Sequence, residues 1–338
     1  MDWNKSYSAT WRVFKVNRNT WADAERIQNV ISAEVVKTAD GSVIESGNLK
    51  VTGTFEPDYY RIVMTAEQSG EVARVNVATL LFNSAGGEFD YGVETHDVNG
   101  FSVLYPASVK TVITGEYAPA GVNGAEYARG LLESAINAPV DVEGAFVLNE
   151  NIVHELGTSV IEAVWNVLRA GEFVIQIDGR GVVHIRPKPT EPSLIIDNSQ
   201  LGMLLNGISF NADMSEIPNR YIIIDGVNIT VAENNDTESV VSIPSRGYCV
   251  DTVDTSPTTV NGETYSEYAN RMLKTLSTLQ DEREYTREYA PDVYPYSIIR
   301  ATTNGLNGDL RVRSQSIVCT NGISVSEKAI KEIHLYGG

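Results

Sequence analysis

The sequence predicts a mainly β protein with an α+β insert, in which two small β-barrel or β-sandwich domains flank helix-hairpin modules. Short stretches of alternating apolar and polar residues, separated by turn residues, recur at both ends of the chain. Two helical stripes and a hairpin occupy the part between them, and the cleanest helical stripe interrupts the second series of strands. These three observations predict the fold class.

Residues 1–115 are predicted to form the N-terminal β-barrel domain. The segment SATWRVFKVNR alternates, and later segments alternate around turns at Asp40-Gly41 and Ser69-Gly70. Further strands are expected at 91–96 and 101–105. Several short strands with little helix are typical of a small sandwich or barrel.

An α+β domain is predicted over residues 116–192. A Gly/Ala/Pro linker at 119–124 marks the boundary, and the first helix, 123–137, begins at Asn123 and ends before Pro139.

The second helix of this domain is predicted at 158–169, with Ser159 and Glu162 at capping-box spacing and Gly171 at its C-terminal end. Trp165 lies in its apolar stripe and is expected in the core. The apolar stripe consists of Val160, Ile161, Val164, Trp165 and Leu168.

A hairpin comes next, at 172–186. Phe173, Ile175 and Ile177 alternate with other residues before the turn DGRG, and Val183 and Ile185 resume the alternation after it. Pro187 and Pro189 then close the second strand.

Residues 193–338 are predicted to form a second β-barrel domain with a helical insertion at about 235–290. Thr264 and Glu267 have capping-box spacing in front of an apolar stripe that ends at Leu279. Three or four strands come after this helix, with turns at Asn307-Gly308 and Asn321-Gly322.

The composition of the 338-residue chain is that of a soluble globular protein, with 42% hydrophobic and 21% charged residues. Its 26 Lys and Arg against 44 Asp and Glu give a net charge of −18. This acidic balance argues against nucleic acid or anionic lipid as a specific partner, because phosphate contacts need clustered basic residues. The N-terminus has no apolar signal segment, and no apolar run reaches the length of a membrane span.

The middle hairpin and the segments after it resemble the baseplate hub proteins of phage tails and related contractile injection systems. The resemblance rests on AGEFVIQIDGRGVVHIRPKP, then Ile208-Ser209-Phe210, then IPNRYIIIDG, with Asn219 and Gly226 at the family's turn and strand-end positions. The helix at 264–279 and the closing strands are similar to the C-terminal half of the family. In the N-terminal domain the match rests on strand count alone.

The resemblance implies a structural virion protein that is not an enzyme and needs no cofactor. Hub proteins of this family form a homotrimer that looks sixfold on one face, joins the tail tube to the spike or tip, and surrounds the genome channel. The implied partners are further copies of the chain, a tail tube or distal tail protein, a spike or tip protein, and a tape measure protein. The implied location is the tail baseplate or tip of a virion that is assembled in the host cytoplasm.

No catalytic, cofactor-binding or metal-ligating residues are predicted. His96-Asp97 and His154-Glu155 are the imidazole–carboxylate neighbours, but a zincin helix would need His at position 158, which is Thr158. Both are expected to be surface histidines without a metal role. His184 is expected to face solvent from its hairpin strand. No G-x-S-x-G elbow, P-loop or dinucleotide pattern is present.

The two cysteines are far apart and lack metal-type spacing. Cys249 is expected to be a semi-buried structural thiol, and whether it pairs with Cys319 stays open.

A run of carboxylates is a candidate glycosidase site, since hydrolysis needs two of them facing each other across a cleft. Arg283 and Arg287 interleave with these acids, and Tyr285 and Tyr289 alternate with them, so a solvated face is the favoured interpretation. The chain also ends at Gly338, directly after the last predicted strand. Two alternatives to the hub remain, a tail-associated cell-wall glycan hydrolase and a carbohydrate-binding β-sandwich module. The run consists of Asp281, Glu282, Glu284 and Glu288.

Overall fold

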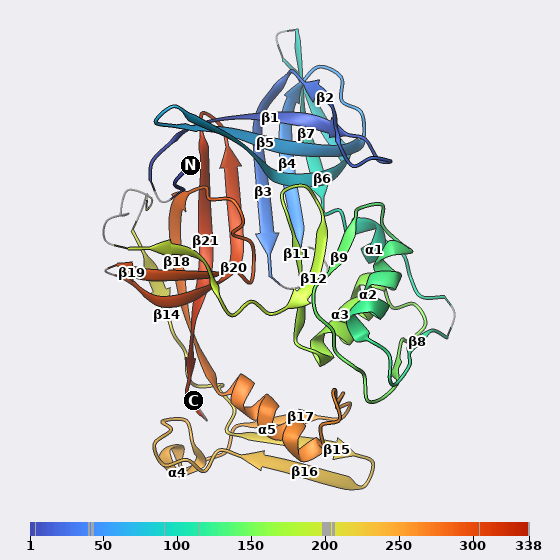
Figure 1. The fold of residues 1–338 in the computed structure, drawn as a ribbon, viewed down its shortest axis with the longest axis vertical. Helices are drawn as coiled ribbons and strands as arrows, with labels where there is room; N and C mark the ends of the chain where they lie inside the picture. Colours follow the sequence, from blue (N-terminus) through green and yellow to red (C-terminus); the bar gives the residue numbers. More distant parts are fainter. Residues whose placement is uncertain are drawn as a thin grey trace.

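One large sheet combines strands from both ends of the chain in this computed structural model (Figure 1). The structure describes residues 1–3, 5–39, 41, 44–90, 92–113, 115–197, 204, 207–303 and 305–336. Asp40 of the predicted first turn and residue 91 of a predicted strand lie outside these ranges.

The N-terminal half of the sheet is a series of seven strands: β1 Ser8–Val16, β2 Asp23–Ile27, β3 Val30–Thr38, β4 Glu45–Thr52, β5 Asp58–Gln68, β6 Glu71–Asp90 and β7 Val93–Phe101. The C-terminal half adds six: β13 Pro192–Ile196, β14 Ser209–Asn211, β18 Thr278–Glu288, β19 Ile298–Thr303, β20 Leu306–Cys319 and β21 Ile323–His334. Across the described residues the strand order is β14-β18-β21-β20-β3-β4-β7-β6-β5-β1-β2, with β19 also beside β20 and β13 beside β19.

The two halves meet where β20 pairs with β3. This antiparallel ladder runs from Ser314 opposite Thr38 to Cys319 opposite Ala33. The prediction of a mainly β fold with an α+β insert is confirmed, and the strand order shows one open sheet in place of closed barrels.

The middle unit packs three helices against small sheets: α1 Tyr105–Val109, β8 Tyr117–Ala118, α2 Gly124–Glu133, β9 Val140–Val142, β10 Ile152–Val153, α3 Val160–Ala170, β11 Phe173–Ile177 and β12 Val183–Pro187. Asn123 and Ser159 cap α2 and α3 as predicted. α2 ends at Glu133, before the predicted end at residue 137. The hydroxyl of the next residue, Ser134, donates to the Leu131 carbonyl. Gly171 closes α3 without a left-handed φ, and a Cβ there would lie only 2.4 Å from the Phe146 ring.

The turn between β11 and β12 packs on the N-terminal half of the large sheet. The Thr79 hydroxyl donates to the Gly179 carbonyl, and the Arg61 guanidinium donates to the Arg180 carbonyl. A Cβ on Gly179 would lie 1.8 Å from the Asn76 carbonyl oxygen, so only glycine fits this approach. The turn therefore joins the middle unit to the sheet.

The insertion unit, residues 217–277, forms one end of the molecule (Figure 1). Its elements are β15 Arg220–Asp225, β16 Asn228–Glu233, α4 Ile243–Arg246, β17 Asp251–Asp254 and α5 Tyr265–Leu276. The predicted capping box of Thr264 and Glu267 is formed. The unit begins before residue 235, and β18 returns the chain to the large sheet at Thr278 instead of extending the insertion to 290. None of the helices in the described part of the chain is long and apolar enough to span a membrane.

Candidate assembly surfaces

The acidic run on β18 is not the uniformly solvated face that the sequence suggested. Its side chains alternate, so Tyr285 and Arg287 face the core while Glu284 faces solvent. Asp281 pairs with Arg283 on the inner side. Asp281 lies on the inner face of the strand, whereas Glu282, Glu284 and Glu288 lie on the outer face, where Glu282 and Glu288 border two different hollows.

Burial raises the pKa of Glu288, the last acid of this run. It borders a hollow of about 470 Å³ that is otherwise lined by neutral residues from β1, β20 and β21. Glycoside hydrolysis needs a second carboxylate across the cleft. The described lining of this hollow contains no second carboxylate.

The histidines are more enclosed than the sequence indicated. His154 is buried, its ring stacks on Tyr127, and its Nε2 lies 3.2 Å from the Tyr127 hydroxyl. Burial lowers the pKa of His154. The expectation that it is a surface histidine is therefore wrong.

His184 lies between two carboxylates and its side chain is 19% exposed, so it is only partly open to solvent. Its Nδ1 is 3.4 Å from Asp141 and its Nε2 is 3.6 Å from Asp178. Among the described residues no group of three or more His, Cys, Asp or Glu is placed to hold a metal ion.

The two cysteines are both free, and they differ in environment. Cys249 is exposed, so the prediction of a semi-buried thiol is wrong. Cys319 ends β20 in the core, where burial raises its pKa to about 12.

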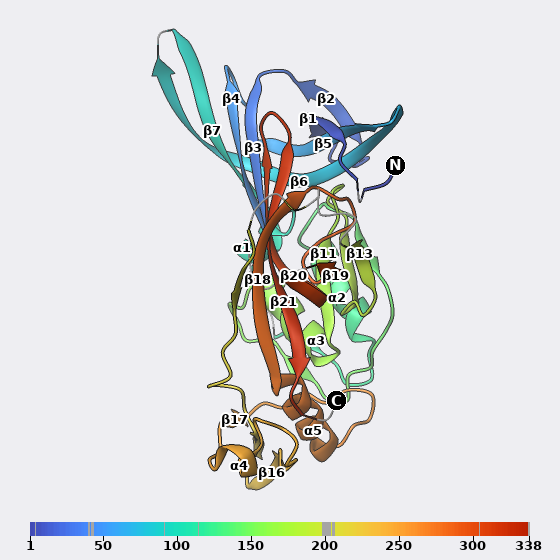
Figure 2. The same ribbon diagram turned by 90° about the vertical axis from the view of Figure 1, so that its left-hand side faces the viewer.

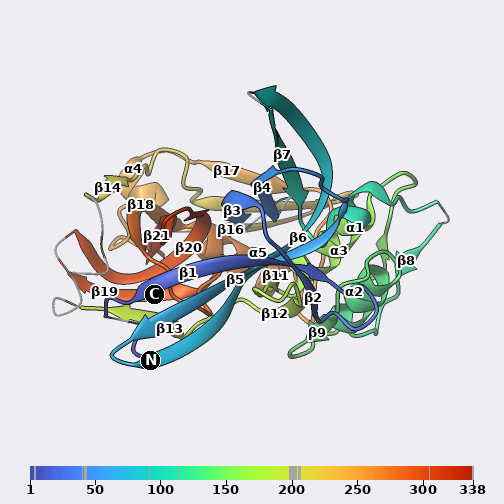
Figure 3. The same ribbon diagram turned by 90° about the horizontal axis from the view of Figure 1, so that it is seen from above.

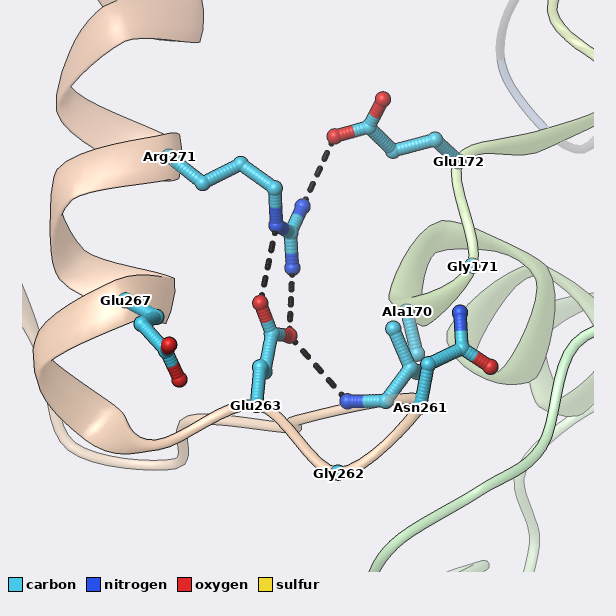
Figure 4. Close-up of a pocket in the computed structure, with 9 residues that line it drawn as sticks. Ala170, Gly171, Glu172, Asn261, Gly262, Glu263, Glu267 and Arg271 are labelled. Carbon is cyan, nitrogen blue, oxygen red and sulfur yellow. Dashed lines mark hydrogen bonds and ion pairs between the residues drawn. The ribbon is translucent and has the colours of Figure 1, made fainter.

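A cavity of about 450 Å³ lies between α5, the end of α3 and the loop at 259–263 (Figure 4). Arg271 fills its centre, donating to both oxygens of Glu263 at 2.7 and 3.1 Å and to Glu172 at 2.7 Å. Glu267 accepts from the Thr264 amide and hydroxyl, and these bonds lower its pKa. Each of these carboxylates is held in an ion pair or in a helix cap, and this arrangement favours a structural clamp.

The same loop fixes the insertion unit to the middle unit. The Asn261 amide donates to the Val147 carbonyl at 3.1 Å, and the Gly262 amide donates to Asn149 Oδ1 at 2.8 Å. Val260 and Leu148 form a β-bridge beside them. Together with the Arg271–Glu172 ion pair, these contacts hold the two units in one orientation.

An apolar ribbon lies along the outer side of the middle unit. β8 and β10 pair Tyr117 with Val153, and the ladder continues through hydrogen bonds between Val112 and the 157–158 turn. Large apolar side chains along it are exposed to solvent, which marks an interaction surface when they gather in this way. They are Val109, Ile113, Tyr117, Val153 and Leu156, between 48% and 82% exposed.

The β6–β7 hairpin projects from the large sheet (Figures 2 and 3). β5 stops pairing with β6 at Phe82, and β4 stops pairing with β7 at Thr95. The outer end carries the exposed side chains of Phe89 and Val93. A hairpin end without sheet neighbours is marginally stable alone, so its apolar tip suits contact with another protein.

Sequence patterns did not single out these surfaces. The alternation in the hairpin and the ribbon predicts strands, but it cannot tell which face another polypeptide covers. The one available signal was the apolar content of short segments, at Ile113, Tyr117 and Val153.

No family model matches the chain, and no curated protein matches it in sequence. Solved structures do match over nearly its full length. The tail protein from Neisseria meningitidis MC58 has a TM-score of 0.70 at 10% identity, covering 96% of this chain and 97% of that one. The 43 kDa tail protein of prophage MuSo2 from Shewanella oneidensis has a TM-score of 0.63 at 12% identity, over 95% and 98%.

Prophage tail protein gp18 from Listeria monocytogenes EGD-e is similar with a TM-score of 0.55 at 11% identity, covering 94% of each chain. At sequence identities of 10–12%, these similarities show a shared fold alone. The chain therefore has the fold of phage tail proteins, the class of protein that its sequence resembles.

Proposed function

We propose that this chain is the central hub of a phage tail baseplate or tail tip, or of a related injection particle. Three copies form a ring that joins the tail tube or distal tail protein to the spike or tip and surrounds the genome channel. The observation that carries the proposal is the match of the whole chain, 96% of it, to a tail protein of almost the same extent. The predicted division at residues 115 and 192 belongs to this proposal.

The mechanism is interface geometry. A closed ring of identical subunits needs two different, complementary surfaces on each copy. The apolar ribbon and the tip of the β6–β7 hairpin lie on separate elements and supply surfaces of the required kind. Assembly takes place in the host cytoplasm, and the finished ring belongs to the virion, where a tape measure protein is a further partner.

A tail-associated glycan hydrolase is less well supported. The carboxylates around Arg271 are held in ion pairs or by a helix cap, and Glu288 stands alone in its hollow. A carbohydrate-binding module is also less well supported, since sugars stack on grouped aromatic rings. The most exposed aromatic side chains of the described part lie in four separate segments of the chain: Phe89 on β6, Tyr117 on β8, Phe210 on β14 and Tyr248 in the loop after α4.

Light scattering and cryo-electron microscopy test the proposal. We expect the purified chain to form a trimer at high concentration, and antibodies to it to label one end of the tail in particles from the producing cells. Particles that lack the chain would contradict the hub assignment.

An activity assay separates the hub from the hydrolase. Incubation with peptidoglycan or polysaccharide should release neither muropeptides nor reducing sugar. Release that a single substitution such as Glu288→Gln abolishes would support the hydrolase instead.

A further inference from the structure

The sheet of the insertion unit has one covered face and one bare face. Its strand order is β16-β15-β17, and α5 packs on the side where Tyr221, Ile223 and Ala232 are buried. The other face of the sheet, called the bare face below, carries the side chains of the alternate residues of each strand. A sheet with only one buried face normally carries polar residues on the other face.

The bare face is apolar instead. Ile222 pairs with Val231 on one side and with Val253 on the other, which makes an apolar row across all three strands. Ile229 adds to this row opposite Ile224. Ile229, Val231 and Val253 are 66%, 48% and 54% exposed, and Val227 in the adjoining turn is 96% exposed.

The sequence of β15 agrees with this arrangement. Three consecutive isoleucines, 222–224, place apolar side chains on both faces of one strand. Such runs are typical of strands that are covered on both sides. Turns normally carry polar or small residues, so the exposed Val227 extends the same surface.

Charge indicates what kind of molecule covers the face. At one end of the apolar row, Arg220 pairs with Asp251 at 2.7 Å and lies 4.0 Å from Glu233, so the acids exceed the base. The whole insertion unit has eight Asp and Glu against four Lys and Arg. Two copies of this face would bring like charges together, which costs binding energy. A surface with a basic rim complements it.

We propose that the bare face of the β15–β17 sheet docks a different protein, whose surface has an apolar centre and a rim of Lys and Arg. A hollow of about 660 Å³ along β16, lined by Ile229, Val231 and Asn235 among others, receives part of that partner. This docking is separate from the contacts between copies of the chain in the proposed ring, and it does not depend on the hub assignment.

Site-specific photo-crosslinking tests the docking. The photoreactive residue p-benzoylphenylalanine replaces Ile229 on the bare face or, as a matched control, the exposed Lys274 on α5 behind the sheet. The full chain is expressed in the cells that naturally produce it. We expect position 229 to crosslink to one different polypeptide with basic residues at the crosslinked surface, and position 274 to give no such product. A dimer of this chain, or equal products from both positions, would overturn the proposal.

A second set of variants tests the charge of the rim. With the probe at Val253, we expect Ile229→Lys to reduce crosslinking about tenfold or more and Ile229→Glu to reduce it less, because lysine repels a basic rim. Equal losses would exclude charge complementarity. Since Ile229 is exposed, both variants should keep the urea midpoint of the unmodified chain. Whether the chain is present in particles is scored separately, so failure of the hub assignment and failure of the docking are distinguishable.

Discussion

Arg287 on β18 and Glu327 on β21 form a two-pronged ion pair in which both side chains are fully buried. Arg287 Nε donates to one carboxylate oxygen at 2.9 Å and an η-nitrogen donates to the other at 2.6 Å. Gln315 on β20 donates to the same carboxylate at 2.6 Å. Three neighbouring strands are therefore tied through one buried charge pair.

Glu327→Gln should destabilise the fold by about 3–5 kcal/mol, because it leaves the Arg287 charge buried without its counter-charge. Urea unfolding measures the loss. The double variant Arg287→Met/Glu327→Leu should regain much of it, since apolar residues of similar volume replace a buried pair at little cost. A Glu327→Gln protein of normal stability would show that the charge of Arg287 is compensated elsewhere.

Trp165→Ala should cost about 3–5 kcal/mol, the usual loss for a buried aromatic side chain. The Trp165 side chain is 5% exposed in the core, and its indole N–H donates to the Gly41 carbonyl at 3.1 Å. Trp165→Phe keeps most of the packing and loses the hydrogen bond, so its cost should be smaller. Chemical denaturation compares the two, and equal stability of all three proteins would contradict the core position.

His154 should make the fold less stable in mild acid. Its pKa is lowered by burial, so the folded state keeps the ring neutral while the unfolded chain takes up a proton below about pH 6.5. The stabilisation is present above that pH and is lost as the pH falls toward the folded-state pKa, by at most about 1.4 kcal/mol per pH unit. The urea midpoint should fall less between pH 7.0 and pH 5.5 in His154→Gln than in the unmodified chain. An unchanged difference between the two midpoints would argue against a neutral, buried ring.

The thiols should react at very different rates. Cys249 is exposed, whereas Cys319 is buried and its raised pKa keeps it protonated. A colorimetric thiol reagent should label one cysteine in the native protein and two in urea. Cys249→Ser should abolish the fast phase, and fast labelling that persists in this variant would place Cys319 at the surface.

Duplex DNA should not bind the protein at physiological salt. Each chain has a net charge of −18, so the proposed ring of three would be strongly acidic, whereas a basic lining would hold duplex DNA in its channel by counterion release. We therefore expect few Lys and Arg on the inner wall. Fluorescence anisotropy with labelled duplex checks the binding, and a continuous basic belt around the bore of the assembled ring would contradict the prediction.

Local patterns predicted the elements whose stability depends on near neighbours. The stripe that contains Trp165 and the caps at Ser159 and Thr264 lie within a few residues of what they stabilise, so the helices and the hairpin could be predicted. Arg287 could not be placed, because its partner Glu327 is 40 residues away and faces it only after β18 pairs with β21. His154 looked exposed for the same reason, since it lies in the loop after β10 and its cover comes from Tyr127 on α2.

The surfaces were least predictable. Alternation predicts which residues of a strand share a face. It does not show whether that face is buried by the same chain or by another molecule. β15 is the partial exception, because its three isoleucines place apolar side chains on both faces.

The pairing of β3 with β20 also constrains how the chain can be made. The ribosome releases β3 long before β20, and until β20 arrives β3 presents an unpaired edge with Val35 and Ala33. Such an edge is a template for pairing with other chains. Nascent or truncated chains should therefore be prone to aggregation or need a chaperone, and the sheet can be completed only late in translation.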